Sequence, residues 1–202
     1  MRHRRMLGVP MMILCLLLAS CGQDGQGGGS KAEQLALEIR TEYIVMTACT
    51  ASMDVTADYG ERVYQYTMDL TYTKEGDTLL TVTAPESVAG VSARLTAGQT
   101  ALVYEGVRLE TGPLSADGMS PVDAVPALLS AAREGFLAEC VLEDRDGVQV
   151  LQTVCRDPEA SPGVGLEYRL WYDAATHALL RGEVARDGYT VIQCVFTSFT
   201  MA

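Results

Sequence analysis

A strict two-residue alternation in the segment Arg62–Lys74 limits the fold of this chain more than any other feature. From position 64 to position 73 every second residue is apolar or aromatic, and the residues between them are polar. Because successive side chains of a β-strand point to opposite faces, this pattern predicts a strand with one buried face. The face that we expect to be buried carries Tyr64, Tyr66, Met68, Leu70 and Tyr72.

Ten further segments have strand character and are separated by turn residues. The strongest hairpin signals are Asp146-Gly147 and Asp187-Gly188, because Asp-Gly suits the left-handed backbone of a two-residue turn. The other predicted strands are Cys49–Ala57, Thr78–Thr83, Val91–Leu95, Ala101–Tyr104, Val107–Glu110, Leu137–Glu143, Val148–Arg156, Gly165–Tyr172, Leu179–Arg186 and Tyr189–Thr200.

Two segments have helical spacing and a capping signal at their start. Ser30 is expected to cap the first helix together with Glu33. Ser120 is expected to cap the second together with Asp123, and Gly135 to end it in a left-handed conformation. The predicted apolar stripes are Ala32, Leu35, Ala36, Ile39 and Tyr43 in the first helix, and Val125, Leu128, Leu129 and Ala132 in the second.

These elements predict a mainly β protein of the α+β class. About eleven strands in one antiparallel sheet must curl to bury one face, so we expect an open or half barrel. The two main helices should cover its concave side. We find no internal repeat, and residues 31–202 are expected to form a single domain.

The first thirty residues have the pattern of a bacterial lipoprotein signal. A basic start precedes an apolar run from Met11 to Ala19, and the cleavage motif Leu18-Ala19-Ser20 is followed by Cys21. Residues 1–20 are therefore the predicted signal peptide. Residues 21–30 are the predicted lipidated cysteine with a Gly-rich tether. We expect diacylglycerol and palmitate on Cys21 to hold the domain at the extracytoplasmic face of the cell membrane.

Two other interpretations of this segment remain. One is an ordinary cleaved signal with an incidental cysteine, and the other is a membrane-spanning helix. The apolar run is shorter than the roughly 20 residues that a spanning helix needs. The order and spacing of basic start, apolar run, small residues and cysteine favour the lipoprotein interpretation.

The charge balance argues against nucleic acid as a partner. The chain has 26 acidic and 15 basic residues, and three of the basic residues lie in the predicted signal. So acidic a surface repels phosphate backbones and anionic lipid headgroups. We therefore expect the lipid on Cys21, and not the protein surface, to provide the contact with the membrane.

Four cysteines remain after the signal and the lipidation site are set aside, namely Cys49, Cys140, Cys155 and Cys194. None forms a Cys-x-x-Cys pair, which argues against zinc and redox sites. The hairpin register set by Asp146-Gly147 places Cys140 diagonal to Cys155, so a strained bridge is one interpretation. Four small buried hydrophobic residues are the other.

The sequence offers no catalytic constellation, metal site or cofactor motif. Gly90-Val91-Ser92-Ala93-Arg94 lacks the final glycine of a nucleophile elbow, and His177 is expected to be a solvated turn residue. Acidic pairs such as Asp54 and Asp58 are expected to lie at solvated strand edges. We predict that the chain is not an enzyme. The stripe from Tyr64 to Tyr72 is either core packing or, at the concave face, the wall of an acyl-chain pocket.

The carboxyl-terminal segment resembles a known family pattern. Leu170-Trp171-Tyr172-Asp173, Leu179-Leu180-Arg181, Asp187-Gly188 and Val195-Phe196 with Phe199 resemble the "Leu-Trp-x-Asp … Leu-Pro-Leu … Asp-Gly … Phe-x-x-Phe" run of LolA-like and RseB-like domains. The order of lipobox, tether, helix, long hairpin, central helix and five-strand meander is also similar to the LolA/LolB lipoprotein-carrier fold.

The resemblance implies two functions, a partner-binding lipoprotein and a lipid or lipoprotein carrier. Among the lipid-anchored Gram-positive members, the germination lipoprotein GerS binds a peptidoglycan amidase, whereas LolA-type carriers bind an acylated cargo in the concave pocket. The carriers have an arginine before the strand-end proline that latches the pocket, and Ala84 stands there in this chain. We therefore expect a membrane-anchored module that binds an envelope protein, with lipid binding at Tyr64–Tyr72 as the alternative.

Overall fold

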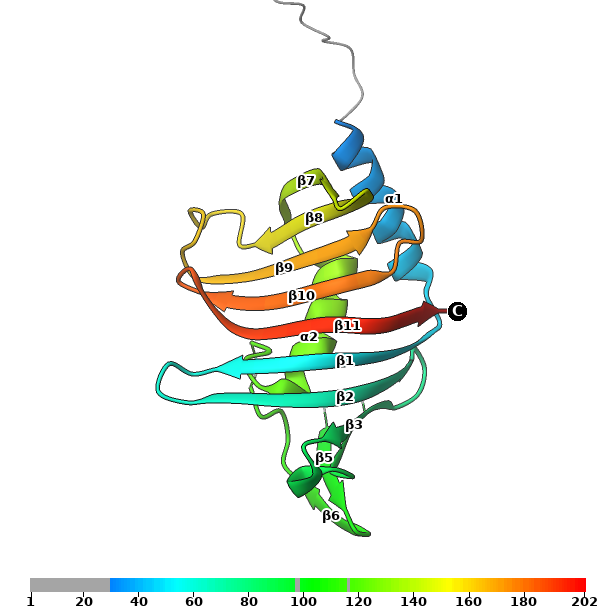
Figure 1. The fold of residues 1–202 in the computed structure, drawn as a ribbon, viewed down its shortest axis with the longest axis vertical. Helices are drawn as coiled ribbons and strands as arrows, with labels where there is room; N and C mark the ends of the chain where they lie inside the picture. The colour runs from blue at the N-terminus through cyan, green and yellow to red at the C-terminus, as the bar shows by residue number, and fades with distance from the viewer. Residues whose placement is uncertain (1–29, 97–98, 116) are drawn as a thin grey trace, which may run out of the picture.

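The computed structural model describes residues 30–96, 99–115 and 117–202, and in it eleven strands form one antiparallel sheet (Figure 1). The helices are α1 (Lys31–Val45) and α2 (Pro121–Glu134), with a short 3₁₀ turn η1 (Glu86–Val88). The strands are β1 (Ala48–Asp58), β2 (Val63–Thr73), β3 (Thr78–Ala84), β4 (Ser92–Thr96), β5 (Gln99–Tyr104), β6 (Val107–Glu110), β7 (Leu137–Arg145), β8 (Val148–Arg156), β9 (Leu166–Asp173), β10 (Leu179–Arg186) and β11 (Tyr189–Met201).

The sheet consists of two meanders joined by the pairing of β1 with β11. The strand order is β6-β5-β4-β3-β2-β1-β11-β10-β9-β8-β7, so β6 and β7 lie at its two ends and the sheet does not close into a barrel. The β1–β11 pairing runs from Cys49 opposite Met201 to Ala57 opposite Ile192. The predicted mainly β, open, eleven-stranded antiparallel sheet with two helices is confirmed.

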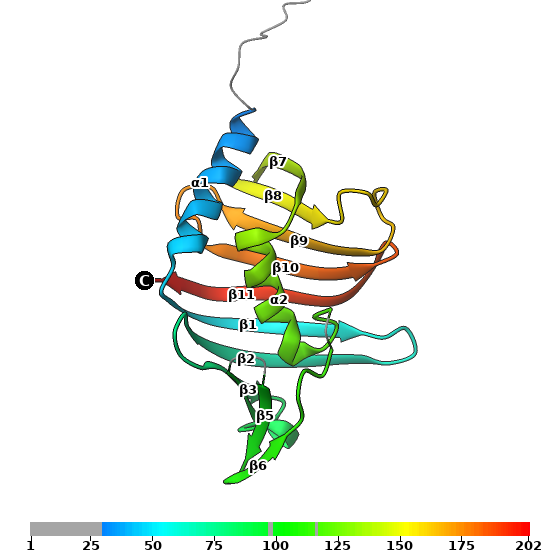
Figure 2. The same cartoon turned by 180° about the vertical axis from the view of Figure 1, so that it is seen from behind.

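Both helices lie against one face of the sheet (Figure 2). The central helix α2 crosses the middle strands and packs on β9, β10, β11 and β1, while α1 packs on α2, β7 and β8. Leu128 of α2 fits over Gly182 of β10, where a Cβ atom would lie only 2.5 Å from Leu128 Cδ1. The core is therefore a layer between the helices and the concave face, centred on β9, β10, β11 and β1.

The predicted helix starts are confirmed at both caps. Ser30 Oγ accepts a hydrogen bond from the Glu33 N–H at 3.2 Å, and Glu33 Oε2 accepts from the Ser30 N–H at 2.6 Å. Ser120 Oγ accepts from the Asp123 N–H at 3.1 Å. The Asp123 carboxylate differs from the predicted box, because it accepts from the Ser120 hydroxyl and the Ser115 N–H. This contact ties the loop before α2 to the helix.

The prediction of a left-handed Gly135 is wrong. Gly135 has φ −61° and ψ 146°, which is extended backbone. Glycine is required there because of packing, since a Cβ atom would lie 2.9 Å from Cys155 Cβ and 2.7 Å from the Ala131 carbonyl oxygen. The Gly135 carbonyl also accepts a hydrogen bond from Arg40 Nη2 at 2.7 Å. The residue type at position 135 is thus determined by packing between α2 and β8, and its carbonyl group is bound by α1.

Candidate functional site

The five residues of the predicted stripe on β2 share one face and differ in burial. Met68 and Leu70 are buried in the core, and Tyr66 and Tyr72 are half-buried against it. The Tyr72 hydroxyl accepts a hydrogen bond from Arg133 Nη1 of α2 at 3.1 Å. Tyr64 is exposed, with its ring centroid 6.2 Å from that of Tyr59. The stripe therefore packs on the core at its centre and reaches solvent at its start.

The space between the helices and the sheet is filled by side chains. The cavity lined by Ile39 and Arg40 of α1, Ala132 of α2 and Tyr172 of β9 has a volume of about 10 Å³. That volume accommodates no more than a single water molecule. In this conformation the region where the helices cover the sheet is a packed core.

Beyond β2 the same apolar face continues, and in the described part of the chain neither α1 nor α2 packs on it (Figure 2). The cross-strand register places Leu102 and Tyr104 of β5 beside Leu109 and Val107 of β6, all on the face that carries Leu80 and Leu70 further along the sheet. Val107 is 71% exposed and Leu109 61% exposed. We call Tyr104, Val107 and Leu109 the apolar tip.

The apolar tip is the candidate binding surface of this protein. Single exposed hydrophobic residues are normal, but adjacent ones on an uncovered sheet face mark interaction sites. The sequence indicated β6 correctly as a strand, yet it gave no sign that the helices stop short of it. Only the strand order shows that Val107 and Leu109 lie at the end of the sheet.

The convex face of β8, β9 and β10 carries an ordered ladder of charged side chains. Glu167 accepts hydrogen bonds from the Gly163 N–H at 2.8 Å and from Arg169 Nη2 at 2.8 Å. Arg156 Nη1 lies 3.5 Å from Glu167 Oε1 and 2.6 Å from Glu139 Oε1. The ladder borders an open hollow of about 310 Å³.

The same network of charged side chains extends to β10 and β11. Glu183 pairs with Arg181 and, at 3.7 Å, with Arg169, and the Arg181 guanidinium lies 5.1 Å from the ring centroid of Trp171. Trp171 Nε1 is buried and is without a hydrogen-bond partner among the described residues. The carboxylates of this ladder are matched by arginines, so the hollow offers no excess charge to a ligand.

Glu167 is held ionised by these contacts. Burial by itself raises the pKa of Glu167, but the Gly163 N–H and the guanidinium groups of Arg169 and Arg156 outweigh burial, and the pKa lies below its usual value. Its side chain is only 4% exposed. A buried carboxylate with these partners stabilises the fold at neutral pH and is not poised to exchange a proton.

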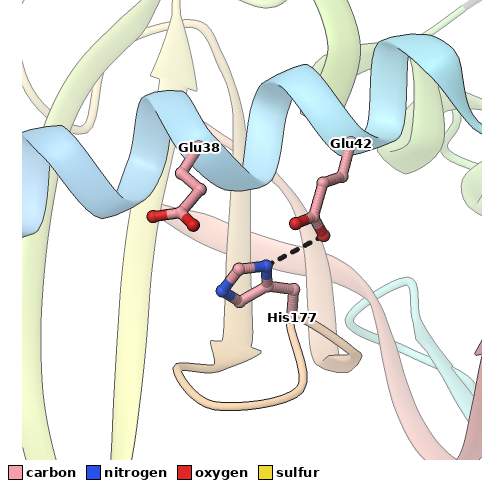
Figure 3. Close-up of side chains that lie close together, drawn as sticks. All are labelled: Glu38, Glu42 and His177. Carbon is pink, nitrogen blue, oxygen red and sulfur yellow. Dashed lines mark hydrogen bonds and ion pairs between the residues drawn. The ribbon is translucent and has the colours of Figure 1, made fainter.

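His177 differs from its predicted role as a solvated turn residue. Its side chain is 14% exposed, and Nδ1 lies 2.8 Å from Glu42 Oε2 of α1 (Figure 3). Its carbonyl accepts a hydrogen bond from the buried Tyr43 hydroxyl at 3.1 Å. The turn between β9 and β10 is thus fastened to α1, because the helix packs where the sequence alone indicated solvent.

Glu38, Glu42 and His177 also form the group that comes nearest to a metal-binding set among the described residues, with ligand atoms within 4.8 Å of one another. One imidazole and two carboxylates suit a divalent cation. Here, however, His177 Nδ1 is engaged by Glu42, and Glu38 is exposed. The contact that the structure shows links helix α1 to the turn between β9 and β10.

The acidic pair Asp54 and Asp58 is not brought together as a site. Asp54 Oδ1 accepts a hydrogen bond from Thr67 Oγ1 at 2.9 Å. A hydrogen bond from the Tyr189 side chain, followed by one from the Gly60 N–H, lowers the pKa of Asp58. Each carboxylate is thus held separately by its own neighbours.

The four remaining cysteines are free thiols. The register predicted from Asp146-Gly147 is confirmed, with Cys140 opposite Thr153 and so diagonal to Cys155, but no disulfide joins them in the described part of the chain. Burial raises the pKa of Cys49 to about 11 and that of Cys194 to about 12. These thiols therefore stay protonated at neutral pH and pack as small hydrophobic residues.

The predicted cleavage motif Leu18-Ala19-Ser20 and the predicted lipidation site Cys21 lie outside the described residues. Among the described residues, neither helix has the length and hydropathy needed to cross a membrane.

Comparison with known proteins shows the fold. No family model and no curated protein sequence matches the chain. An uncharacterised conserved protein from Thermus thermophilus is similar in structure, with a TM-score of 0.52, 10% identity, and coverage of 85% of this chain and 88% of that one. MucB gives a TM-score of 0.51 and 14% identity, with coverage of 87% of this chain and 60% of MucB.

A chain in the complex of the CwlD amidase with the GerS lipoprotein from Clostridioides difficile is a weaker match. It has a TM-score of 0.40 and 16% identity, and 87% of this chain and 99% of that one are covered. The predicted LolA/RseB-like fold is confirmed by the structural matches.

Proposed function

We propose that this protein is a non-enzymatic lipoprotein, anchored through Cys21 to the extracytoplasmic face of the cell membrane, that binds an envelope protein through the apolar tip. The observation that carries the proposal is the exposure of Val107 and Leu109 on a sheet face that the helices leave uncovered. Burying such a face against a partner removes apolar surface from water and favours association.

The position of the apolar tip supports a protein partner and argues against contact with the lipid bilayer. The described chain begins at Ser30, at the α1 end of the long axis, and β6 lies at the opposite end (Figure 1). An anchor at Cys21, close in sequence to α1, would leave β6 pointing away from the membrane. The apolar tip would then face other proteins of the envelope.

The structural relatives include proteins that bind partners. MucB forms a complex with MucA in Pseudomonas aeruginosa, and the GerS lipoprotein forms one with the CwlD amidase. At these levels of identity the relatives establish the fold of this chain and leave its partner open. A cell-wall amidase is the candidate that the sequence resemblance implies.

Binding of a lipid or an acylated cargo by Tyr64, Tyr66, Met68, Leu70 and Tyr72 is the alternative proposal. It requires α1 and α2 to move away from the sheet, because Arg133 of α2 is hydrogen-bonded to Tyr72 and the space near Tyr172 is about 10 Å³. An acyl chain that co-purifies with the protein in native mass spectrometry would support it.

Capture of the partner from membranes tests the proposed function. The full chain, tagged at its carboxyl end, is crosslinked in membranes, and captured proteins are identified by mass spectrometry. We expect one reproducible envelope protein, and the double variant Val107→Asp/Leu109→Asp should reduce its capture about tenfold or more, because two charges then lie in the contact surface. A Cys21→Ala variant should leave the membrane fraction in the same experiment.

The matched control is Val141→Asp/Val148→Asp. These two exposed valines lie on β7 and β8, at the opposite end of the sheet, and undergo the same chemical change. Capture by this control should equal that of the unmodified protein. Equal capture by both double variants, or no reproducible partner for the unmodified protein, would refute binding through the apolar tip.

A further inference from the structure

The outer edge of β6 presents a free row of backbone hydrogen-bonding groups. β6 has β5 as its one sheet neighbour among the described residues, and all four of its residues are exposed. An edge strand of this kind is a template for pairing with another strand. The strand that can pair with β6 depends on which residues of β6 direct their N–H and C=O groups away from β5.

The hairpin geometry shows that Arg108 and Glu110 carry these outward groups. Glu105 and Gly106, with φ of 48° and 80°, form the two-residue turn between β5 and β6, so the flanking pair Tyr104–Val107 is hydrogen-bonded. Hydrogen-bonded and non-hydrogen-bonded pairs alternate along an antiparallel ladder. The bond from the Thr111 N–H to the Thr100 carbonyl, at 2.9 Å, fits this alternation and confirms its phase.

We propose that two copies of this protein pair through β6 in an antiparallel arrangement whose two-fold axis passes between Leu109 and Leu109 of the second copy. Arg108 of each copy then lies opposite Glu110 of the other. These residues carry the outward N–H and C=O groups, so each of the two pairs exchanges both backbone hydrogen bonds. The proposal goes beyond the proposed binding function and does not depend on it.

Charge complementarity selects this register. Arg108 and Glu110 share the convex face of β6, and within one copy they form an ion pair of 2.5 Å between Arg108 Nε and Glu110 Oε1. In the proposed register each arginine also faces a glutamate across the axis, and opposite charges on directly opposed residues stabilise a sheet. In a register centred on Arg108, the arginines of the two copies would lie opposite each other and repel. In a register centred between Arg108 and Leu109, each arginine would lie opposite a leucine.

The side chains on the concave face also match in this register. Leu109 lies directly opposite its counterpart in a non-hydrogen-bonded pair, where side chains approach most closely. The two apolar tips therefore meet at the axis and form one continuous apolar surface. Charged residues commonly protect edge strands through repulsion, but an alternation of opposite signs attracts a second copy.

The location of β6 leaves both copies free at their other end. Helix α1 lies at the opposite end of the sheet, so pairing through β6 leaves α1 of both copies free (Figure 1). Two four-residue strands bury less surface than a standard protein interface of roughly 1,600 Å². We therefore expect a weak dimer, favoured by high local concentration on a membrane.

Cysteine crosslinking in membranes tests the register directly. In the full chain with Leu109→Cys, the two introduced thiols lie on opposed residues with Cα atoms about 4.5 Å apart, within disulfide range. With Val107→Cys they lie about 14 Å apart along the strand, beyond that range. After oxidation with copper–phenanthroline, non-reducing electrophoresis should show a crosslinked dimer for Leu109→Cys, about tenfold above Val107→Cys and the unmodified chain.

Charge exchange supplies the second arm of the test. In the Leu109→Cys background, Arg108→Glu opposes glutamate to glutamate in both pairs and should lower the crosslinked fraction about tenfold. Adding Glu110→Arg reverses both signs and should restore it. Equal crosslinking at positions 107 and 109, strongest crosslinking from Arg108→Cys, or no recovery in the exchanged variant would overturn the proposal. Partner capture plays no part in this readout, so failure of the dimer and failure of the proposed binding function are distinguishable.

Discussion

Replacing Leu128 by alanine is expected to lower the free energy of unfolding by about 2–5 kcal/mol, the usual range for a leucine truncated in a closed core. Leu128 is fully buried on α2 and covers Gly182 of β10, so its loss leaves a cavity at the centre of the helix–sheet contact. Urea unfolding followed by circular dichroism measures the change. Leu37→Ala is the control, because Leu37 lies exposed on α1 and its truncation should have an effect below about 0.5 kcal/mol.

The same contact can be tested from its other side. Gly182→Val places a branched side chain where Leu128 Cδ1 already lies within 2.5 Å of an ideal Cβ position, and overpacking of this kind costs about 1–3 kcal/mol. Combined with Leu128→Ala, the valine fills part of the cavity, so the double variant should be more stable than the sum of the single changes implies. Additive losses would show that α2 does not pack on β10 as described.

Removing the charge of Glu167 is expected to be the second large change, about 3 kcal/mol at neutral pH for Glu167→Gln. The carboxylate is buried between Gly163, Arg169 and Arg156, and the neutral amide leaves two arginines short of a partner. Because the pKa of Glu167 is lowered in the folded protein, the carboxylate contributes its stability above the unfolded-state value near 4.5. That contribution is lost as the pH falls below this value.

The pH dependence separates charge from packing. The free energy of unfolding of the unmodified protein should fall faster than that of Glu167→Gln as the pH is lowered from about 4.5, so the gap between the two should narrow. Glu139→Gln serves as control, because Glu139 is half exposed and pairs with Arg156 from the rim of the ladder. Parallel pH curves for Glu167→Gln and the unmodified protein would show that the ladder does not hold Glu167 ionised.

The local pattern predicted the elements well, because period-two alternation and capping signals are local properties. The strand over Arg62–Lys74 appears as Val63–Thr73, and the β7–β8 register follows from Asp146-Gly147 as far as Glu139, where a bulge shifts it. Local patterns failed where a distant element decides the outcome. Position 135 requires glycine because Cys155 lies against it, and His177 is half-buried because α1 passes over its turn.

The candidate site could be predicted only in part for the same reason. Tyr64 and Val107 have similar sequence surroundings, since each begins an alternation of apolar and polar residues. The sheet order places Tyr64 on an interior strand, where it is 39% exposed, and Val107 on an end strand, where it is 71% exposed, because the helices cover only the middle of the sheet. Exposure of an apolar face is thus a property of the assembled sheet and is absent from any short segment.

Site-specific photocrosslinking from Tyr104 tests partner binding through the apolar tip most directly. Benzoylphenylalanine replaces Tyr104 in the full chain, and in a second chain it replaces Tyr189, a tyrosine of equal 46% exposure at the start of β11. After irradiation of intact membranes, we expect an adduct with one envelope protein from position 104 and none from position 189. Equal adducts from both positions, or none with another protein from position 104, would contradict the account.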